Sequence, residues 1–153
     1  MTEILALIPA RMGSSRFPGK PLAKILGEPM IEHVYRRVSV NKKLSTTVVA
    51  TCDLEIANFI DSIGGRVVMT SDKHERASDR CAEALKILEN EEGKRFEIVV
   101  MVQGDEPMIH PEMITEALQP MLDDQKILVV NLLGKIKSAE EWEDRNCIKV
   151  VSD

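Results

Sequence analysis

Three cationic side chains lie within ten residues of one another near the start of the chain. Arg11, Arg16 and Lys20 belong to the segment A-R-M-G-S-S-R-F-P-G-K-P-L at residues 10–22. Because glycine frees the backbone and proline lacks an N–H, this segment is predicted to be a loop rather than a helix or strand. Backbone N–H groups, bidentate arginines and a point-charge lysine suit phosphate oxygens. The loop therefore has the chemistry to bind a polyanion such as a nucleoside triphosphate.

A solvated basic turn is the alternative for this loop, and three cations taken alone favour that alternative. The loop, however, directly follows the apolar run at residues 4–9. In an open α/β sheet, ligands bind beyond the carboxyl ends of the strands, which is where this loop would lie. Its spacing matches neither G-x-x-x-x-G-K-[ST] nor G-x-G-x-x-G. The sequence thus indicates a phosphate site that uses neither of the common nucleotide fingerprints.

A second polar motif, V-Q-G-D-E-P at residues 102–107, follows another apolar run. If both runs are parallel strands, this motif and the basic loop face each other across one crevice. A carboxylate opposite a triphosphate favours a bridging divalent cation, and Mg²⁺ commonly binds phosphate oxygens together with one or two carboxylates. Asp105 is therefore the candidate metal ligand, and Gln103 is placed to hydrogen-bond a sugar or base. The alternatives are a turn or capping role for Asp105 and a solvated turn for Glu106.

Hydrophobic periodicity predicts strands and helices that alternate along the chain. The predicted strands are 4–8, 46–51, 66–69, 98–102, 127–133 and 148–151. The predicted helices are 30–39, a segment capped by Asp53 and ended by Gly64-Gly65, a segment that starts at Ser78 or Asp79 and is closed by the polar residues 89–95, and a segment starting at Pro111 that Pro120 bends or ends. This alternation predicts an α/β fold with a doubly wound, mostly parallel sheet and helices on both faces.

Length and composition exclude several classes of protein. The 153 residues are the size of one domain, so residues 1–153 are expected to form a single nucleotide-binding α/β domain. A net charge of −5 argues against general nucleic-acid binding, and no apolar run is long enough to span a membrane. Three widely spaced cysteines and the lack of a signal peptide are typical of the cytoplasm. The three histidines have no metal-binding spacing.

The end of the chain reads as a strand, at residues 146–153, with nothing after it. Domains seldom stop at an edge strand that is neither capped nor paired. We therefore expect the chain to be the N-terminal portion of a longer enzyme.

Three motifs together resemble one family. They are I-P-A-R-M-G-S-S-R-F-P-G-K-P-L at residues 8–22, V-V-M-T-S at 67–71 and V-Q-G-D-E-P-M-I at 102–109. This combination resembles the 3-deoxy-manno-octulosonate cytidylyltransferases, or CMP-Kdo synthetases, of bacterial lipopolysaccharide synthesis. The resemblance spans essentially the whole chain and implies a Rossmann-like nucleotidyltransferase fold. Members of that family are roughly 100 residues longer, which agrees with the expected N-terminal portion.

The resemblance also implies roles for individual residues. Arg11 and Lys20 would bind the CTP phosphates, with help from Arg16, and would stabilise the transition state and the leaving pyrophosphate. The remaining implied residues are donors at Ala10, Gly13 and Ser14, a cytosine and ribose pocket at Leu7, Met69 and Thr70, a sugar or nucleotide contact at Gln103, and a Mg²⁺ ligand at Asp105. The anomeric hydroxyl of Kdo, or of a related keto-deoxy sugar acid, would attack the α-phosphorus in line, without a covalent enzyme intermediate.

One segment departs from the family pattern. The family usually has H-x-S-G-T-[DE]-R where this chain has H-E-R-A-S-D-R at residues 74–80. Ser78 and Arg80 keep the substrate-binding hydroxyl and guanidinium, whereas Arg76 and Ala77 replace Ser and Gly. If the family glycine has a positive φ, Ala77 would be strained; if it admits the nucleotide, Arg76 would reshape that space. The family's second metal carboxylate and most of its sugar-binding residues would lie beyond residue 153.

Two other functions are compatible with the sequence. One is a sialic-acid-like or other sugar nucleotidyltransferase, and the other is a non-catalytic nucleotide-binding or assembly domain. The expected partners are CTP and a keto-deoxy sugar acid, with no nucleic acid and no membrane. A homodimer is left open.

Overall fold

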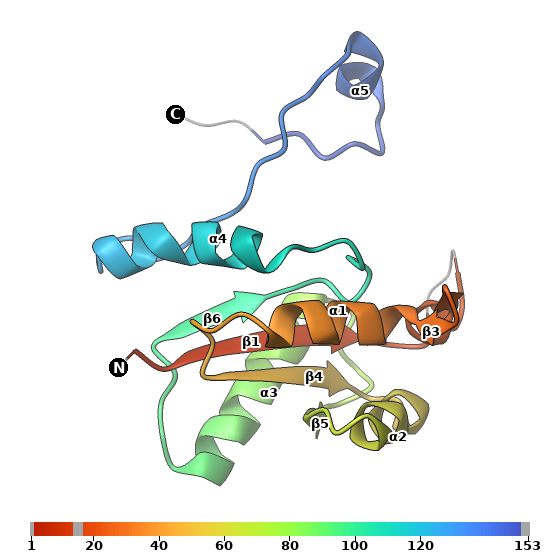
Figure 1. Ribbon diagram of the computed structural model, residues 1–153, viewed down its shortest axis with the longest axis vertical. Helices are drawn as coiled ribbons and strands as arrows, with labels where there is room; N and C mark the ends of the chain where they lie inside the picture. Colours follow the sequence, from red (N-terminus) through yellow and green to blue (C-terminus); the bar gives the residue numbers. More distant parts are fainter. Residues whose placement is uncertain (1, 14–16, 151–153) are drawn as a thin grey trace. The chain divides into compact units, whose positions relative to one another are not determined.

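The computed structural model describes residues 2–13 and 17–150, and its central feature is a four-stranded parallel sheet. The strands are β1 (Ile4–Ala10), β4 (Thr46–Thr51), β5 (Val67–Met69) and β6 (Ile98–Met101), in the order β5-β4-β1-β6 (Figure 1). β1 pairs with β4 on one side and with β6 on the other. The chain therefore winds outward from β1 in one direction and then returns to its other side, which confirms the predicted doubly wound topology.

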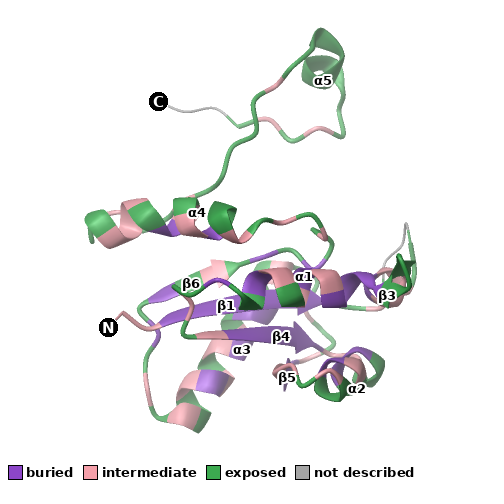
Figure 2. Cartoon of the chain, in the orientation of Figure 1, coloured by how far each residue is buried: buried purple, intermediate pink, exposed green. Residues whose placement is uncertain are grey.

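Helices cover both faces of this sheet. Side chains alternate between the faces along a strand, so Leu5 and Leu7 point to one face of β1 and Ala6 and Ile8 to the other. All four are fully buried. Helix α3 (Ala77–Glu92) packs on the face that bears Leu5 and Leu7. Helices α1 (Met30–Ser39) and α2 (Leu54–Ser62) contact the strands as well and bring their own buried stripes (Figure 2).

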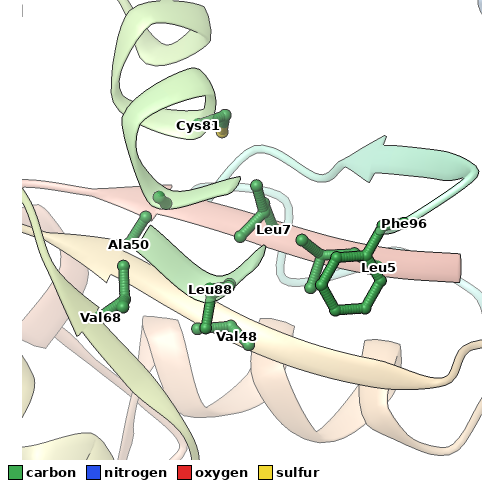
Figure 3. Packing of buried hydrophobic residues seen from close by; sticks show 9 residues of the cluster. Leu5, Leu7, Val48, Ala50, Val68, Cys81, Leu88 and Phe96 are labelled. Atoms are coloured by element: carbon green, nitrogen blue, oxygen red, sulfur yellow. The ribbon is translucent and has the colours of Figure 1, made fainter. Parts of the chain in front are cut away.

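The core beneath α3 draws on every strand of the sheet except β6. Figure 3 shows Leu88 of α3 next to Val48 of β4, and Cys81 of α3 belongs to the same buried cluster. Burial raises the pKa of the Cys81 thiol to about 11, so at neutral pH this residue is a protonated, apolar part of the core. The complete cluster is Leu5, Leu7, Val48, Ala50, Val68, Cys81, Ala84, Leu88 and Phe96.

The element boundaries agree closely with the periodicity in the first 115 residues. α1 and β4 have the predicted bounds, and α2 ends just before Gly64, whose φ is 72°. β1 is two residues longer than predicted and β6 one residue shorter. Asp53, however, does not cap α2 with its side chain. That prediction was wrong because the carboxylate makes a different contact, described below.

Short elements that periodicity did not predict follow the basic loop. A 3-10 turn, η1 (Lys20–Leu22), falls inside the segment predicted to be loop. A small antiparallel pair follows, β2 (Lys24–Ile25) and β3 (Glu28–Pro29), connected by Leu26 and Gly27, which both have positive φ. These elements are too short to generate a periodic signal.

The chain divides into two compact units, Met1–Thr115 and Glu116–Asp153, and the sheet lies in the first. Helix α4 (Pro111–Asp123) contains Pro120 and continues past it, so the proline does not end the helix. The second unit also holds α5 (Ala139–Glu143), where the Ser138 Oγ accepts a hydrogen bond from the Glu141 N–H.

The two strands predicted in the second unit are not formed. Residues 127–133 and 148–150 have no strand structure, and residue 151 lies outside the described residues. Leu128 is 80% exposed and Ile148 is 89% exposed. A strand needs a hydrogen-bonded neighbour, and within the described ranges 2–13 and 17–150 nothing pairs with either segment. The described residues include no helix long and apolar enough to cross a membrane.

Candidate functional site

The two polar motifs meet because their strands are neighbours. β1 ends at Ala10 and β6 ends at Met101, and the two strands pair in parallel register. Their carboxyl ends therefore open at the same edge of the sheet. From β1 the chain adds β4 and β5 on one side of the sheet and then crosses to add β6 on the other side, so the strand order reverses between β1 and β6. Ligands of open α/β sheets bind at such a switch point.

The turn after β6 lies directly against the end of β1. The Val102 N–H donates to the Leu7 carbonyl at 2.9 Å, and the Glu106 N–H donates to the Gln103 carbonyl at 3.2 Å. Between them, Gly104 approaches β1 so closely that a Cβ on it would lie 2.7 Å from the Pro9 carbonyl oxygen. Only glycine fits there, and this contact fixes how far Asp105 stands from the loop after β1.

Gly104→Ala is therefore expected to destabilise the fold by about 1–3 kcal/mol, because two backbones must separate to admit the methyl group. Urea unfolding would measure the change. Gly134→Ala is the matched control, because nothing lies within 4 Å of a Cβ at that position. The control should change stability by less than about 0.5 kcal/mol. Equal effects of the two substitutions would contradict the close contact as the cause.

An ion pair joins the two motifs. The Lys20 Nζ lies 2.6 Å from the Asp105 Oδ2. The two side chains are 36% and 47% exposed, and ion pairs this accessible contribute only about 0–1 kcal/mol. Both groups can therefore exchange their mutual contact for a ligand: the ammonium for an anion, and the carboxylate for a cation.

A cleft of about 630 Å³ lies at this edge of the sheet. Its walls come from the end of β1 and the residues after it, the turn after β6, and the segment that begins α3. The described residues that line it are Pro9, Ala10, Arg11, Phe17, Lys20, Pro21, Met30, His74, Glu75, Arg76, Ala77, Arg80, Gln103, Gly104 and Asp105. The cleft is large enough for a nucleotide-sized ligand, and its charged side chains are mostly cationic.

Arg80 anchors the α3 side of the cleft. Its side chain is buried, and one terminal nitrogen, Nη1, donates to the Thr70 Oγ1 and to the Ser71 carbonyl. The other, Nη2, is buried and has no hydrogen-bond partner among the described residues. A buried guanidinium N–H without an acceptor is costly. Arg80 therefore has donor capacity left for a ligand in the cleft that it lines.

The segment before α3 is held by Glu83. Its Oε2 accepts from the Ser71 N–H at 2.8 Å and lies 2.5 Å from the His74 Nε2, which must carry the proton because a carboxylate only accepts. The Ser71 N–H first, and His74 second, hold the pKa of Glu83 below its ordinary value of 4.5. Glu83 thus holds both the backbone at Ser71 and the side chain of His74, which lines the cleft.

This lowered pKa gives an acid dependence with a defined sign. A carboxylate whose pKa is depressed by folding stabilises the protein above pH 4.5, and this stabilisation is lost as pH falls through its lower folded-state pKa. The stability difference between wild type and Glu83→Gln is therefore expected to shrink from about pH 6 to about pH 3 in urea unfolding. Glu55→Gln, at an exposed carboxylate of α2, is the control. A Glu83→Gln difference that stays constant over this range would contradict the assignment.

The structure brings six of the predicted site residues to the cleft, and the other described ones are not among its lining residues. Those that line it are Ala10, Arg11, Lys20, Arg80, Gln103 and Asp105. Leu7 is a fully buried core residue under α3, and Thr70 is buried against Arg80. Gly13, Met69 and Ser78 are not among the described lining residues, and Ser14 and Arg16 lie outside the described residues.

Sequence reasoning missed several lining residues. Phe17, Pro21 and Met30 were interpreted as loop or helix residues without a role in the site, and His74, Glu75 and Gly104 were not singled out as lining residues. Ala77 begins α3 without a positive φ, so the strain expected at this position does not occur. Arg76 does line the cleft, so the space at this position is occupied by a further cation. Residues 74–77 lie beyond the end of β5 and at the start of α3, and this position could have indicated that they line the site.

The described residues contain no cluster of three or more His, Cys, Asp or Glu side chains that could hold a metal ion by themselves. Asp105 is one of two carboxylates that line the cleft, with Glu75, among mostly cationic charged side chains. A cation bound there would need ligands from a substrate as well.

Comparison with known proteins places this architecture in a family. A family model described as cytidylyltransferase matches residues 5–153. The chain belongs to the cytidylyltransferase family. The curated 3-deoxy-manno-octulosonate cytidylyltransferase of Geobacter metallireducens is 44% identical over 151 residues, which are 99% of this chain and 57% of that protein. The protein of the same name from Syntrophus aciditrophicus is 42% identical over 153 residues, or 60% of its length.

Solved structures agree with this family. A structure of CMP:2-keto-3-deoxy-manno-octonic acid synthetase in complex with CTP superimposes with a TM-score of 0.75 and 40% identity, over 81% of this chain and 49% of that chain. A cytidylyltransferase from Leptospira borgpetersenii, at 24% identity and a TM-score of 0.69, shares the fold. The chain spans between 57% and 60% of the length of the curated relatives named above.

Proposed function

We propose that this protein transfers the cytidylyl group of CTP to 3-deoxy-manno-octulosonate (Kdo), or a related keto-deoxy sugar acid, and releases pyrophosphate. The observation that carries the proposal is the convergence of Arg11, Lys20 and Arg80 with Asp105 in one cleft at the switch point of the sheet. Supporting it, relatives at 42% and 44% identity are named 3-deoxy-manno-octulosonate cytidylyltransferase.

The cations act on the triphosphate. Arg11 and Lys20 neutralise phosphate oxygens, and they stabilise the negative charge that builds up on the leaving pyrophosphate. Arg80 contributes its unpartnered Nη2 donor from the opposite wall. Arg76 adds a further positive charge to the lining of the cleft. Arg11, Lys20 and Arg80 line the cleft before the ligand arrives, and of these Lys20 must exchange its contact with Asp105 for the phosphate.

The reaction is a direct displacement at phosphorus. The anomeric oxygen of the sugar acid forms a bond to the α-phosphorus, and the bond from this phosphorus to the oxygen that bridges to the β-phosphate breaks. Pyrophosphate leaves with the electron pair of that bond, and the hydroxyl proton passes to water. Gln103, at the same wall as Asp105, hydrogen-bonds the sugar or the nucleotide and so orients the attacking oxygen. The protein contributes positioning and charge rather than a covalent intermediate.

The residues present fit a Mg²⁺ ion that arrives with the nucleotide. Asp105 offers an exposed carboxylate at the cleft, as does Glu75, and Mg²⁺ is commonly held by one or two carboxylates plus substrate phosphates. When bound, the ion would polarise the phosphate oxygens and offset their charge. Lys20 would then release Asp105 and remain as the phosphate-binding cation.

Nucleotide selectivity followed by turnover tests the proposal. Calorimetry with CTP, UTP, ATP and GTP, with and without Mg²⁺, should show preferential, metal-enhanced binding of CTP. Pyrophosphate release should then occur with Kdo and less with sialic acid. Stronger binding of another nucleotide would overturn the cytidylyl assignment. CTP binding without pyrophosphate release from CTP in the presence of any keto-deoxy sugar acid would overturn the catalytic assignment and leave a nucleotide-binding domain.

A further inference from the structure

The carboxylate of Asp53 reaches a neighbouring loop instead of its own helix. Asp53 immediately precedes α2, and its Oδ2 accepts a hydrogen bond from the backbone N–H of Met12 at 2.8 Å. Met12 follows Arg11, which lines the cleft. The bond therefore joins the carboxyl-terminal ends of two neighbouring strands, β4 and β1, at the point where the basic loop begins.

Asp53 is itself held firmly. Its backbone N–H donates to the Thr51 Oγ1 at 3.1 Å, and Thr51 is fully buried. Its carbonyl accepts from the Ala57 N–H at 3.1 Å, which begins α2. Because the backbone of Asp53 is fixed on both sides, its short side chain has little freedom in where it presents the carboxylate.

Met12 is held at both of its backbone polar groups. Its N–H is bonded to Asp53, and its carbonyl accepts from the Gly19 N–H at 3.0 Å. Gly19 has a φ of 74°, a conformation that favours glycine, and leads directly into Lys20. A continuous set of contacts thus connects Arg11 and Lys20 through Met12 and Gly19 to a single carboxylate on the next strand.

We infer that Asp53 is a positioning residue that sets the spacing of Arg11 and Lys20 for a polyphosphate ligand. Asp53 is not among the described residues that line the cleft, so it acts through Met12 and not on the ligand. Without its carboxylate, the Met12 N–H loses a charged acceptor and the base of the loop loses its link to β4. The ligand must then order the two cations on binding, which lowers affinity. The inference rests on the proposed function only in that the natural ligand carries a triphosphate.

The test uses Asp53→Ala, with Asp53→Asn as the variant that keeps an acceptor oxygen. Asp53→Ala is expected to weaken binding of CTP and of inorganic tripolyphosphate by about 10-fold, and that of CMP by less than about 2-fold. Asp53→Asn should recover most of the loss. A role in stability alone would leave the CTP-to-CMP affinity ratio unchanged. Calorimetry at a temperature where each variant is folded measures all three ligands.

Glu89→Ala is the matched structural control. The Glu89 Oε1 likewise accepts a backbone N–H, that of Phe96 at 3.1 Å, but the residue does not line the cleft. Glu89→Ala should lower the melting temperature of the protein without changing the ratio of its CTP and CMP affinities. An unchanged ratio in Asp53→Ala, or an equal change in Glu89→Ala, would overturn the inference. Failure of the wild type to bind tripolyphosphate would overturn it as well, whereas tripolyphosphate binding without CTP preference would overturn only the proposed function.

Discussion

Replacing Arg11 with alanine is expected to weaken CTP binding by about 100-fold or more while leaving the fold intact. Arg11 is exposed and lines the cleft, and it has no ion-pair partner in the described parts of the chain. Its removal therefore leaves no acidic group unpaired and opens no cavity in the core. The loss falls on the ligand, whose phosphate charge would lack its bidentate donor.

Calorimetry for affinity, and thermal unfolding for the fold, measure this prediction. Arg145→Ala is the matched control, because it removes the same charge from an exposed side chain that does not line the cleft and has no ion-pair partner among the described residues. The control separates direct contact from the general loss of one positive charge, which salt would screen. Unfolding of Arg11→Ala would show that the loop has a structural role, and an unchanged CTP affinity would contradict the phosphate assignment.

Lys20→Met is expected to change nucleotide and metal affinity in opposite directions. In the free protein, the Lys20 Nζ forms an ion pair with the Asp105 Oδ2 at 2.6 Å. Without it, Mg²⁺ alone should bind up to about 5-fold more tightly, since an exposed ion pair no longer has to be broken. CTP should bind about 10- to 100-fold more weakly, because a phosphate-binding cation is lost. A purely structural lysine would not produce this reversal.

Asp105→Asn completes the experiment. It should reduce CTP affinity in the presence of Mg²⁺ to nearly the value measured without the metal, because the amide is a poor Mg²⁺ ligand beside phosphate. Glu106→Gln, an exposed carboxylate in the same turn that does not line the cleft, should leave the metal dependence unchanged. Equal losses in Asp105→Asn with and without Mg²⁺ would remove the metal assignment.

The local sequence pattern predicted the strands and helices of the sheet well. It failed where a segment becomes a strand only if a neighbouring strand is there to pair with it. α1 and β4 followed from apolar periodicity because each buries one stripe or a whole strand against the sheet. Residues 127–133 have an equally good strand pattern but remain exposed. A strand is stabilised by its neighbours, and no local pattern records whether a neighbour is present.

The candidate site was predictable at the level of loops but not of contacts. That two motifs follow apolar strands was enough to expect one crevice, because parallel strands share an edge. Their direct contact required β1 and β6 to be adjacent, which periodicity does not determine. Leu7 was assigned to the pocket by resemblance, but its place in the alternation of β1 directs it to the core. Asp53 was interpreted as a helix cap because that role is local, whereas its partner is far along the chain.

The central position of β1 also determines when the cleft can come into existence during synthesis. β1 can pair with β4 as soon as residue 51 has been made, but its other edge waits for β6, whose Ile98 pairs with Ile4. Loops that far apart in sequence close late, after local elements have formed. On the ribosome, then, a chain that holds the whole basic loop lacks the second wall of the cleft until Asp105 has emerged. A ligand that needs both walls stabilises only chains in which β6 has docked, so such a ligand would favour the docked state of β6.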